Sequence, residues 1–516
     1  MVSLTRRKLL KTASALLPLL PAASRNSATG ASTPRSARIT DVILDLNNLY
    51  KWDTSNGDTW DPFWADDDNL YAFNCDGRGF GKELRNLAFN RLAGDSPQTL
   101  SGTMINTMDE YGVSNKKEAD NATWKACGQE GIDSVFYAFV SRNAYGSDSG
   151  DYWLRQTAFN SSLIKSTDRG RTWSRSATEN YTHPMWPGPS FGAPFFIHYG
   201  KNGGNVPRDG ADHYVYAAST NGFWNDGDRY ILGRVPRKKL PDLNAADWGY
   251  FSGGDGKNAK SWSATIRNAV PLVDLPTRCG QSGPCYISAL GAYLMVVWYN
   301  TEKMIKWFEP NEMRYDFYQA PHPWGPWNAV HSYSDQFLSF GHMYGPSLCA
   351  RFQRREGADV HMTLFTSGCP FEDVPTGLYK AWAIPIVVKT SPVIPSTLVP
   401  SGDPRIVYKG DWASSNDGRL LGPVRRTTSA NASAELSFHG IGIEFIADKK
   451  TGFGSVDVLL DGVLAHTAPL SVENLPRLNG ITVFRSKALK SGAHNIRVVN
   501  KSSLPVVVDA FRVYGG

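Results

Sequence analysis

The chain has 516 residues, which exceeds the roughly 100–200 residues of one domain and therefore predicts two or more domains. Lysine and arginine outnumber aspartate and glutamate by 54 to 48, but seven of the basic residues and no acidic one lie in the first 38. The rest of the chain is nearly neutral, which excludes nucleic acid as an expected partner, and a composition of 41% hydrophobic and 20% charged residues excludes a disordered chain.

The N-terminus carries the pattern of an export signal. Residues 5–11 read TRRKLLK, and a short apolar stretch that ends in small residues near Ala23 follows them. This pattern resembles a bacterial twin-arginine signal, although an uncleaved amphipathic segment is the alternative. Residues 1–36 are therefore predicted to be signal peptide and spacer, and the mature protein periplasmic or secreted. No apolar run approaches the roughly 20 residues that span a bilayer.

From residue 39 onward, short apolar runs alternate with turns rich in Gly, Asp, Asn and Pro. The runs are rich in β-branched and aromatic residues, as is typical of strands; examples are 134–140, 213–217, 292–299 and 360–366. The one stretch with a helical pattern is short and spans about 82–92. An all-β chain is therefore predicted.

The strand-like runs fall into groups that each have the size of a propeller blade. The groups lie at about 40–95, 98–180, 190–262, 283–332 and 340–392. Blades bury their faces only against neighbouring blades, so several are needed for stability. We predict a five-bladed β-propeller over residues 37–392, with six or seven blades as alternatives.

The C-terminal part has a different residue pattern. Residues 393–403 are rich in proline and are predicted to be a semi-rigid linker. Beyond them, residues 434–446 alternate strongly between polar and apolar, and Asp461-Gly462 is typical of a hairpin turn. Residues 404–516 are therefore predicted to form a separate, jelly-roll-like β-sandwich that resembles carbohydrate-binding domains. Glycan binding and structural support are both open as its role.

Cysteine content predicts disulfides. An even number of cysteines in an exported protein favours pairing. The six are Cys75, Cys127, Cys279, Cys285, Cys349 and Cys369. The candidate pairs are Cys279 with Cys285, which would close a tight loop, and Cys349 with Cys369. Their spacing lacks the clustered pattern of zinc ligands, so neither a metal nor a cofactor is expected.

Residues 166–173, STDRGRTW, match the Asp-box pattern S-x-D-x-G-x-T-W at every position. In that hairpin the Asp accepts hydrogen bonds from turn amides, the Gly takes a positive φ and the Trp packs into the blade. The motif resembles those of sialidases and other propeller glycosidases. It is a structural motif, so it predicts the fold more strongly than the chemistry.

The candidate catalytic pair comes from an acidic and aromatic segment at residues 57–80. Asp58 and Asp76 flank the two strands of one predicted hairpin, so both carboxylates are expected at the same end of the blade. Paired carboxylates supply the acid and the base of glycosidases. The alternative for each is an aspartate that caps a turn beside glycine. Residues 66–69, DDDN, are predicted to be a solvated turn.

A wider pattern resembles a known family. It includes the segment from Asp58 to Asp76, the Asp-box and the stretches 196–201, 212–216, 230–236, 250–254 and 321–327. Together they resemble, over residues 41–388, the five-bladed propeller family long catalogued as a domain of unknown function, some members of which are endo-D-arabinanases. The resemblance implies an acidic pair at Asp58 and Asp76. The NCDG sequence at 74–77 departs from the Gly-Asp-Thr-Phe-like setting of the family's second acid.

Further residues are candidate substrate contacts. Tryptophan rings stack on sugar faces, and a histidine or aspartate can face a central pocket, although each type is more often structural. The candidates are Trp60, Trp64, His183, Trp186, His198, Asp226 and Trp324.

Together these observations predict an exported, monomeric glycoside hydrolase, similar to endo-D-arabinanases, that cleaves a polysaccharide or complex glycan. Asp58 and Asp76 would be acid and base or nucleophile, in an order that the sequence leaves open. Retention and inversion also stay open, because they depend on the carboxylate separation. The alternatives are a non-catalytic glycan-binding propeller, a sialidase-like hydrolase, which is disfavoured because no arginine triad is visible, and a polysaccharide lyase.

Overall fold

The computed structural model describes residues 39–515 apart from 145–155, 176–181, 208–212, 301–312, 335–342, 369–378, 392–393, 416–422 and 474–476. The predicted export signal and Cys369 lie outside the described residues. Within them, no helix is long and apolar enough to cross a membrane.

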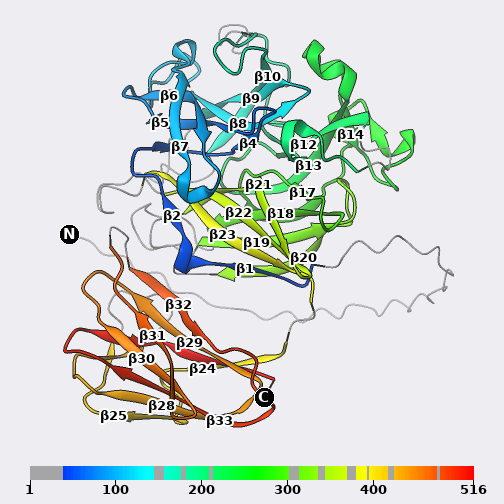
Figure 1. The fold of residues 1–516 in the computed structure, drawn as a ribbon. Helices are drawn as coiled ribbons and strands as arrows, with labels where there is room; N and C mark the ends of the chain where they lie inside the picture. The colour runs from blue at the N-terminus through cyan, green and yellow to red at the C-terminus, as the bar shows by residue number, and fades with distance from the viewer. Residues whose placement is uncertain are drawn as a thin grey trace, which may run out of the picture. The chain divides into compact units, whose positions relative to one another are not determined.

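Residues 41–389 form antiparallel sheets that follow one another along the chain (Figure 1). The first contains β3 (Asn56–Asp58), β4 (Phe63–Trp64), β5 (Leu70–Gly79), β6 (Arg85–Ala93) and β7 (Ser101–Asn106). The second contains β8 (Thr123–Ile132), β9 (Val135–Ala144) and β10 (Thr157–Ser166). The third contains β11 (Ala193–Phe196), β12 (Tyr214–Thr220), β13 (Gly227–Pro236), β14 (Gly249–Phe251), β15 (Trp262–Ser263) and β16 (Val273–Cys279).

Two more sheets complete this part of the chain. The fourth contains β17 (Cys285–Ile287), β18 (Ala292–Asn300), β19 (Met313–Ala320) and β20 (Asn328–Ser334). The fifth contains β21 (Tyr344–Glu356), β22 (Asp359–Ser367) and β23 (Ala381–Lys389), joined by β1 (Asp41–Leu44) and β2 (Tyr50–Lys51). Short 3₁₀ turns lie at Leu46–Asn48, Pro97–Thr99, Asp109–Tyr111, Lys201–Gly203, Arg237–Asp242, Ala245–Asp247, Ala259–Ser261 and Ile266–Asn268.

The innermost strands close a ring. β4 contacts β8, β8 contacts β11, and β21 contacts both β17 and β4. His198, just after β11, forms a parallel bridge with Cys285 of β17. The all-β propeller is thus present, and five sheets in the described residues are consistent with the predicted count. The first strands close the ring differently from the predicted grouping, because β1 and β2 pair with β23 of the last sheet.

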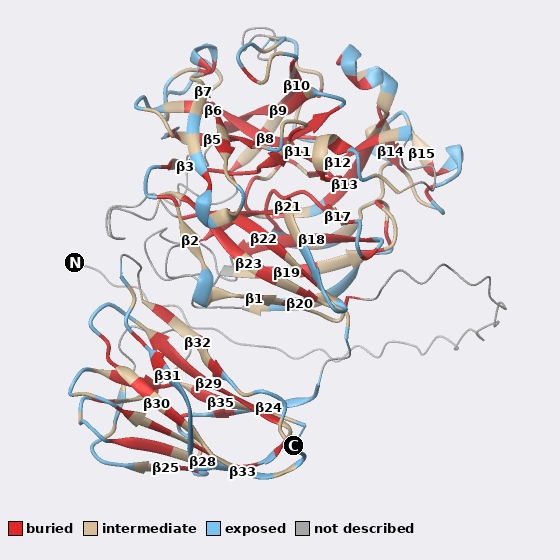
Figure 2. Cartoon of the chain, viewed as in Figure 1, coloured by how far each residue is buried: buried red, intermediate tan, exposed pale blue. Residues whose placement is uncertain are grey.

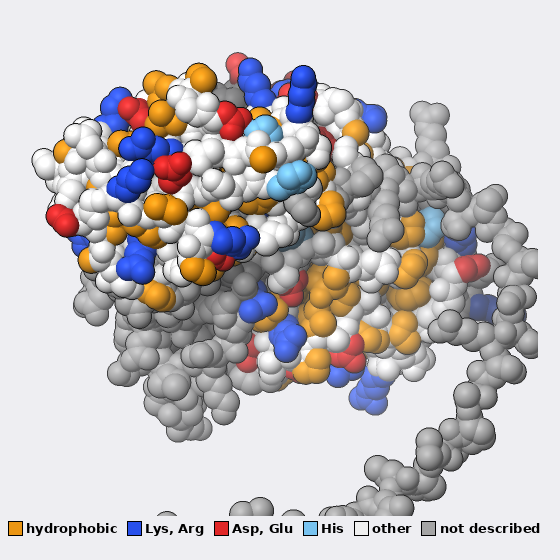
Figure 3. Space-filling model, turned by 90° about the horizontal axis from the view of Figure 1, so that it is seen from below, with side chains coloured by type: hydrophobic (Ala, Val, Ile, Leu, Met, Phe, Trp, Pro, Cys, Tyr) orange, Lys and Arg blue, Asp and Glu red, His pale blue; other side chains and the backbone are white. Residues whose placement is uncertain are grey.

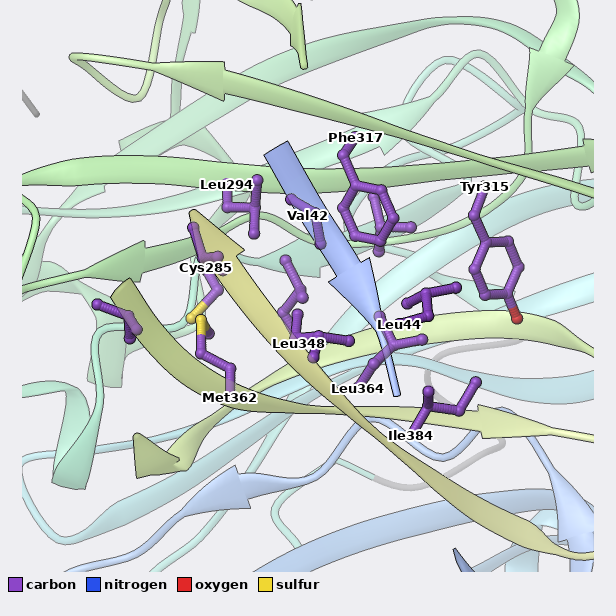
Figure 4. Packing of buried hydrophobic residues seen from close by; sticks show 14 of the residues in the cluster. Val42, Leu44, Cys285, Leu294, Tyr315, Phe317, Leu348, Met362, Leu364 and Ile384 are labelled. Carbon is purple, nitrogen blue, oxygen red and sulfur yellow. The ribbon is translucent and has the colours of Figure 1, made fainter. Parts of the chain in front are cut away.

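Burial explains why these segments are strands. All ten residues of β8 are buried, and the central strands of the other sheets are largely buried too (Figure 2). Between the fourth and fifth sheets, side chains from β1, β18, β19, β21, β22 and β23 point toward one another (Figure 4). The predicted helix at 82–92 is wrong. Residues 86–90 are buried consecutively in β6, which pairs with β5 and β7 on its two sides, so strand pairing overrides the local pattern.

The C-terminal part is a β-sandwich. Its sheets comprise β24 (Ser396–Pro400), β35 (Ala510–Tyr514), β29 (Gly442–Lys449) and β32 (Leu478–Arg485); β25 (Ile406–Lys409), β28 (Ser433–Gly440), β33 (Gly492–Asn500), β30 (Ser455–Leu460) and β31 (Val463–Pro469); and β26 (Ala413–Ser415), β27 (Val424–Thr427) and β34 (Val506–Val508). β24 lies within the predicted linker and pairs with β35. The face in Figure 3 carries basic and acidic side chains next to one another, in keeping with the near-neutral composition.

The predicted disulfide between Cys279 and Cys285 is wrong. Both thiols are free and buried, as are Cys75, Cys127 and Cys349. Cys279 lies opposite Gly227 of the third sheet, whereas Cys285 lies opposite Leu294 of the fourth. The two side chains therefore belong to different sheets, and each sulfur approaches a different backbone carbonyl, 3.8 Å away. Within the described part of the chain, no disulfide is formed.

Candidate active site

Three charged side chains, Asp61, Glu130 and His198, meet at the inner strands; we call them the axial cluster. His198 Nδ1 lies 2.8 Å from Glu130 Oε2, and His198 Nε2 lies 3.0 Å from Asp61 Oδ1. The three side chains are only 2–3% exposed. Ser347 of β21 donates a hydrogen bond to Asp61 Oδ1 at 2.5 Å. The cluster thus ties together the first, second, third and fifth sheets.

The two carboxylates fix the charge of this histidine. Burial alone would lower the pKa of His198, but Asp61 and Glu130 raise it to about 10. Burial raises the pKa of Glu130, and His198 opposes that rise. At neutral pH the imidazole is therefore protonated, and both ring nitrogens donate hydrogen bonds. His198 was predicted as a substrate contact, but the structure seals it in the axial cluster.

Asp58 ends β3 and is 8% exposed. The hydroxyl of Tyr344 donates to its Oδ2 at 2.6 Å, and the hydroxyl of Thr59 donates to its Oδ1 at 3.0 Å. Thr59 itself has a φ of 58°, and its amide donates to Ser367 Oγ at 2.9 Å. The chain therefore turns sharply after Asp58, and contacts to the fifth sheet hold its carboxylate in place.

Asp76 lies next to Asp58 on the neighbouring strand. Asp58 pairs directly with Cys75, and the register shifts at a bulge between Asn56 and Asp58. A Cβ at Gly77 would lie 2.4 Å from the Cα of Gly57, so only glycine allows the two strands to approach this closely. Asp76 has a φ of 48°, which redirects its side chain out of the regular pleat. The structure thus places the two predicted aspartates on adjacent strands, with Asp76 directly after the residue that pairs with Asp58.

A lysine faces Asp76. Lys125 of β8 forms an ion pair with Asp76 Oδ2, and the side chains are 4% and 12% exposed, respectively. The hydroxyl of Tyr379 donates to the backbone carbonyl of Asp76 at 3.2 Å. Lys125 was not predicted from the sequence. Its only signal is a lysine in a strand whose ten positions are all buried, which requires a buried partner for the charge.

Two predicted sugar-stacking rings belong to the core. Trp60 is 1% exposed and donates its indole N–H to the carbonyl of Gly57 at 2.9 Å. Trp186 is 6% exposed and donates to the hydroxyl of Tyr250 at 2.6 Å. Neither ring offers a face to a sugar. Trp64 is half-buried at the first sheet, with its indole N–H 3.3 Å from Asp68 Oδ1.

The remaining predicted contacts lie elsewhere. His183 is exposed beside Thr182, and Asp226 is half-buried in the turn before β13. Trp324 stacks on His322 with ring centroids 5.0 Å apart and meets Trp262 at 6.2 Å. Because Trp262 begins β15, the outermost strand of the third sheet, Trp324 lies at the outer edge of that sheet and away from the axis.

The acidic turn at residues 66–68 is not simply solvated, as was predicted. Arg169 pairs with Asp66 at 3.0 Å and with Asp67 at 2.6 Å, and Lys201 pairs with Asp68 at 2.7 Å. Burial would raise the pKa of Asp67, but hydrogen bonds and the charge of Arg169 lower it. The turn therefore connects the first sheet to segments that follow β10 and β11.

The segment at residues 166–173 forms a tight turn after β10. Asp168 accepts hydrogen bonds from the amide and the hydroxyl of Thr172 at 2.9 and 2.7 Å. Gly170 has a φ of 82°, and the ring of Trp173 packs against Phe73 and Phe89. Arg169 extends from this turn to the acidic turn, so the segment supports the first sheet rather than the carboxylate pair.

The fold is an all-β propeller, and Asp58 and Asp76 lie on the adjacent strands β3 and β5 of its first sheet. The chain belongs to the family described as Domain of unknown function (DUF4185), whose model matches residues 47–367.

Two enzymes of Flavonifractor plautii share short stretches with this chain. An A type blood alpha-D-galactosamine galactosaminidase is 33% identical over 99 residues, which are 19% of this chain and 9% of that protein. An A type blood N-acetyl-alpha-D-galactosamine deacetylase is 33% identical over 110 residues, 20% of this chain and 13% of that protein. The match thus spans only a small part of these relatives.

Similar solved structures include an exo-beta-1,3-galactanase from Phanerochaete chrysosporium with galactose (TM-score 0.38, 12% identity, 92% of this chain and 100% of that chain). Another is a glycoside hydrolase family 43 arabinoxylan arabinofuranohydrolase from Bacillus subtilis (TM-score 0.34, 12% identity, 90% of this chain and 97% of that chain). Likenesses at this level carry no argument about activity.

Proposed function

We propose that the protein is a glycoside hydrolase in which Asp58 and Asp76 are the acid–base pair. The observation that supports this most is the placement of two carboxylates on the adjacent strands β3 and β5, each with a small exposed fraction and each held by partners from other sheets. Such a pair can protonate a leaving oxygen and activate a nucleophile at one bond.

The axial cluster does not fit the same role. Its two carboxylates are 2–3% exposed, and both are bound to His198. A catalytic carboxylate must touch the substrate, so we assign Asp61 and Glu130 a structural role, which is to hold the sheets of the propeller together. Asp58 and Asp76 keep greater exposure, at 8% for the whole residue Asp58 and 12% for the side chain of Asp76.

The substrate that we propose is a polysaccharide or complex glycan that contains arabinofuranose. This finer assignment rests on the resemblance of the chain to propellers that include endo-D-arabinanases. A periplasmic or secreted location would place the enzyme where such polymers occur, and we propose that it acts there as a monomer without a cofactor.

One observation favours a second candidate, a sialidase-like hydrolase. The hydroxyl of Tyr344 lies 2.6 Å from Asp58 Oδ2, and a tyrosine activated by a carboxylate is the nucleophile of sialidases. In that case Tyr344→Phe would abolish turnover. If Tyr344 only orients Asp58, the same substitution would slow the reaction and leave measurable activity.

The test is reducing-end release by the purified protein across a panel of polysaccharides, with arabinogalactan and a sialylated glycan included. Release from an arabinofuranose-containing polymer supports the proposal, and release of sialic acid supports the second candidate. Binding to a glycan without any cleavage would instead favour a non-catalytic glycan-binding propeller and contradict the hydrolase. An unsaturated product would indicate a lyase.

A further inference from the structure

We propose that Lys125 holds Asp76 in its ionised form, so that Asp76 is the base or nucleophile and Asp58 is the acid. The proposal rests on the hydrolase function proposed above and deepens it by assigning the two roles. Lys125 is then a positioning residue, because it acts through Asp76 and not on the substrate.

Lys125 Nζ touches Asp76 Oδ2, and its side chain is 4% exposed, so water screens the ion pair little. An opposite charge in contact favours the ionised form of a carboxyl group. Removing a proton from Lys125 or adding one to Asp76 would leave a buried charge without its partner, which is unfavourable.

Two further groups are described next to Asp76. Cys75 precedes it, and burial raises the pKa of this thiol to about 12, so the sulfur carries no charge at neutral pH. Tyr379 donates a hydrogen bond to the backbone carbonyl of Asp76 at 3.2 Å. Asp58 lies on the neighbouring strand, paired with Cys75.

The surroundings of Asp58 differ in kind. Its described contacts are the hydroxyls of Tyr344 and Thr59, at 2.6 and 3.0 Å. A hydroxyl can donate to a carboxylate or accept from a carboxylic acid, so these partners serve both protonation states. A cation thus contacts Asp76, whereas hydroxyls are the described contacts of Asp58, and two carboxyls in such different environments are the arrangement that separates an acid from a base.

The carboxylic acid of Asp58 gives its proton to the glycosidic oxygen as the bond from that oxygen to the anomeric carbon breaks. Asp76 either takes a proton from the water that attacks the anomeric carbon or forms an ester with that carbon. In the second case, water later cleaves the ester and the Asp58 carboxylate takes the proton of that water. Lys125 keeps its proton throughout.

The decisive measurement is the pH profile of kcat/KM for Lys125→Met and Lys125→Arg, because the acid limb of that profile reports ionisation of the base. Lys125→Met keeps the length of the stem but removes the charge. It should move the acid limb to higher pH by about 1–3 units, which is a loss of about 10-fold to 1000-fold at a fixed pH on that limb. Lys125→Arg keeps the charge and should restore the wild-type limb. Lys116→Met, at an exposed lysine, is the matched control and should change nothing.

A second experiment separates the roles even if Lys125→Met does not fold. The substrate is a 2,4-dinitrophenyl glycoside of the shortest oligosaccharide that the wild type releases, because its leaving group needs no proton. In Asp58→Ala the glycosidic bond of this substrate should still break at near the wild-type rate in the first turnover, whereas Asp76→Ala should not break it. The reverse pattern would overturn the role assignment alone. So would an active Lys125→Met variant whose acid limb of the kcat/KM profile lies at the same pH as that of the wild type. Full activity of both alanine variants on the natural glycan would instead overturn the proposed function.

Discussion

Replacing His198 by glutamine should destabilise the propeller strongly and by an amount that depends on pH. The imidazolium is enclosed between Asp61 and Glu130, and the three side chains are 2–3% exposed. Glutamine has a similar size but no charge, so two buried carboxylates would face each other without a cation. Removing one partner of a buried ion pair costs about 3–5 kcal/mol.

The sign of the pH dependence follows from the raised pKa. The carboxylates raise the pKa of His198 to about 10 against the effect of burial. In the unfolded chain the imidazole titrates near about 6.5. The folded state therefore holds this proton more tightly, and the stabilisation is fully present below about pH 6.5 and lost as the pH rises through about 10. At about 1.4 kcal/mol per pKa unit, the difference between the folded and unfolded pKa of His198 contributes on the order of 5 kcal/mol to the unfolding free energy. This value is similar to the cost of the substitution given above.

Guanidinium denaturation of the wild type and His198→Gln, followed by tryptophan fluorescence, measures this difference. The gap in unfolding free energy should be largest near about pH 6 and should shrink toward about pH 10, while other titrating groups cancel. His183→Gln, at an exposed histidine, should follow the wild type throughout. A gap that stays constant over this pH range would refute the assignment of a charged histidine to the axial cluster.

Two further predictions concern the fold. Gly170→Ala would place a Cβ 2.0 Å from the ring of Phe89, at a φ of 82°. Gly188→Ala is the control, because Gly188 has a similar φ and a Cβ there would have no atom within 4 Å. The overpacking should make Gly170→Ala less stable than Gly188→Ala by about 1–3 kcal/mol. Equal melting temperatures for the two variants would contradict the packing of this turn. Maleimide labelling of unreduced protein should modify Cys75, Cys127, Cys279, Cys285 and Cys349 only after denaturation, because burial raises the pKa of each thiol. A mass that shows Cys279 and Cys285 protected after denaturation would indicate the disulfide that the structure lacks.

Local patterns explain which parts of the fold were predictable. Runs such as 292–299 are rich in β-branched and aromatic residues and form strands, here β18, because a pleated and buried surface suits these side chains. The neighbouring positions of Asp58 and Asp76 followed from a hairpin, which is also a local feature. The segment at 82–92 misled because its apolar spacing fits a helix, whereas pairing with both β5 and β7 makes it a strand.

Long-range contacts explain what was missed. Asp61, Glu130 and His198 come from three sheets and lie up to 137 positions apart, so no spacing in the sequence connects them. The same holds for Lys125 and Asp76, which are 49 positions apart. An even number of cysteines does not encode distance, and Cys279 and Cys285, although near in sequence, belong to different sheets.

The role of Asp58 and Asp76 as the catalytic pair is tested by the turnover of Asp58→Asn and Asp76→Asn on the glycan that the wild type cleaves. Asparagine keeps the shape but cannot transfer the proton, so turnover by the folded protein should fall by about 10²–10⁴-fold. The melting temperature of Asp76→Asn should also fall, because the substitution removes the charge that pairs with the buried Lys125. Asp95→Asn, at an exposed turn, is the control. Asp67 is less suitable as a control, because its substitution would also remove an ion pair with Arg169. Full turnover by either variant, with only its melting temperature lowered, would show that these aspartates are structural and would contradict the proposed mechanism.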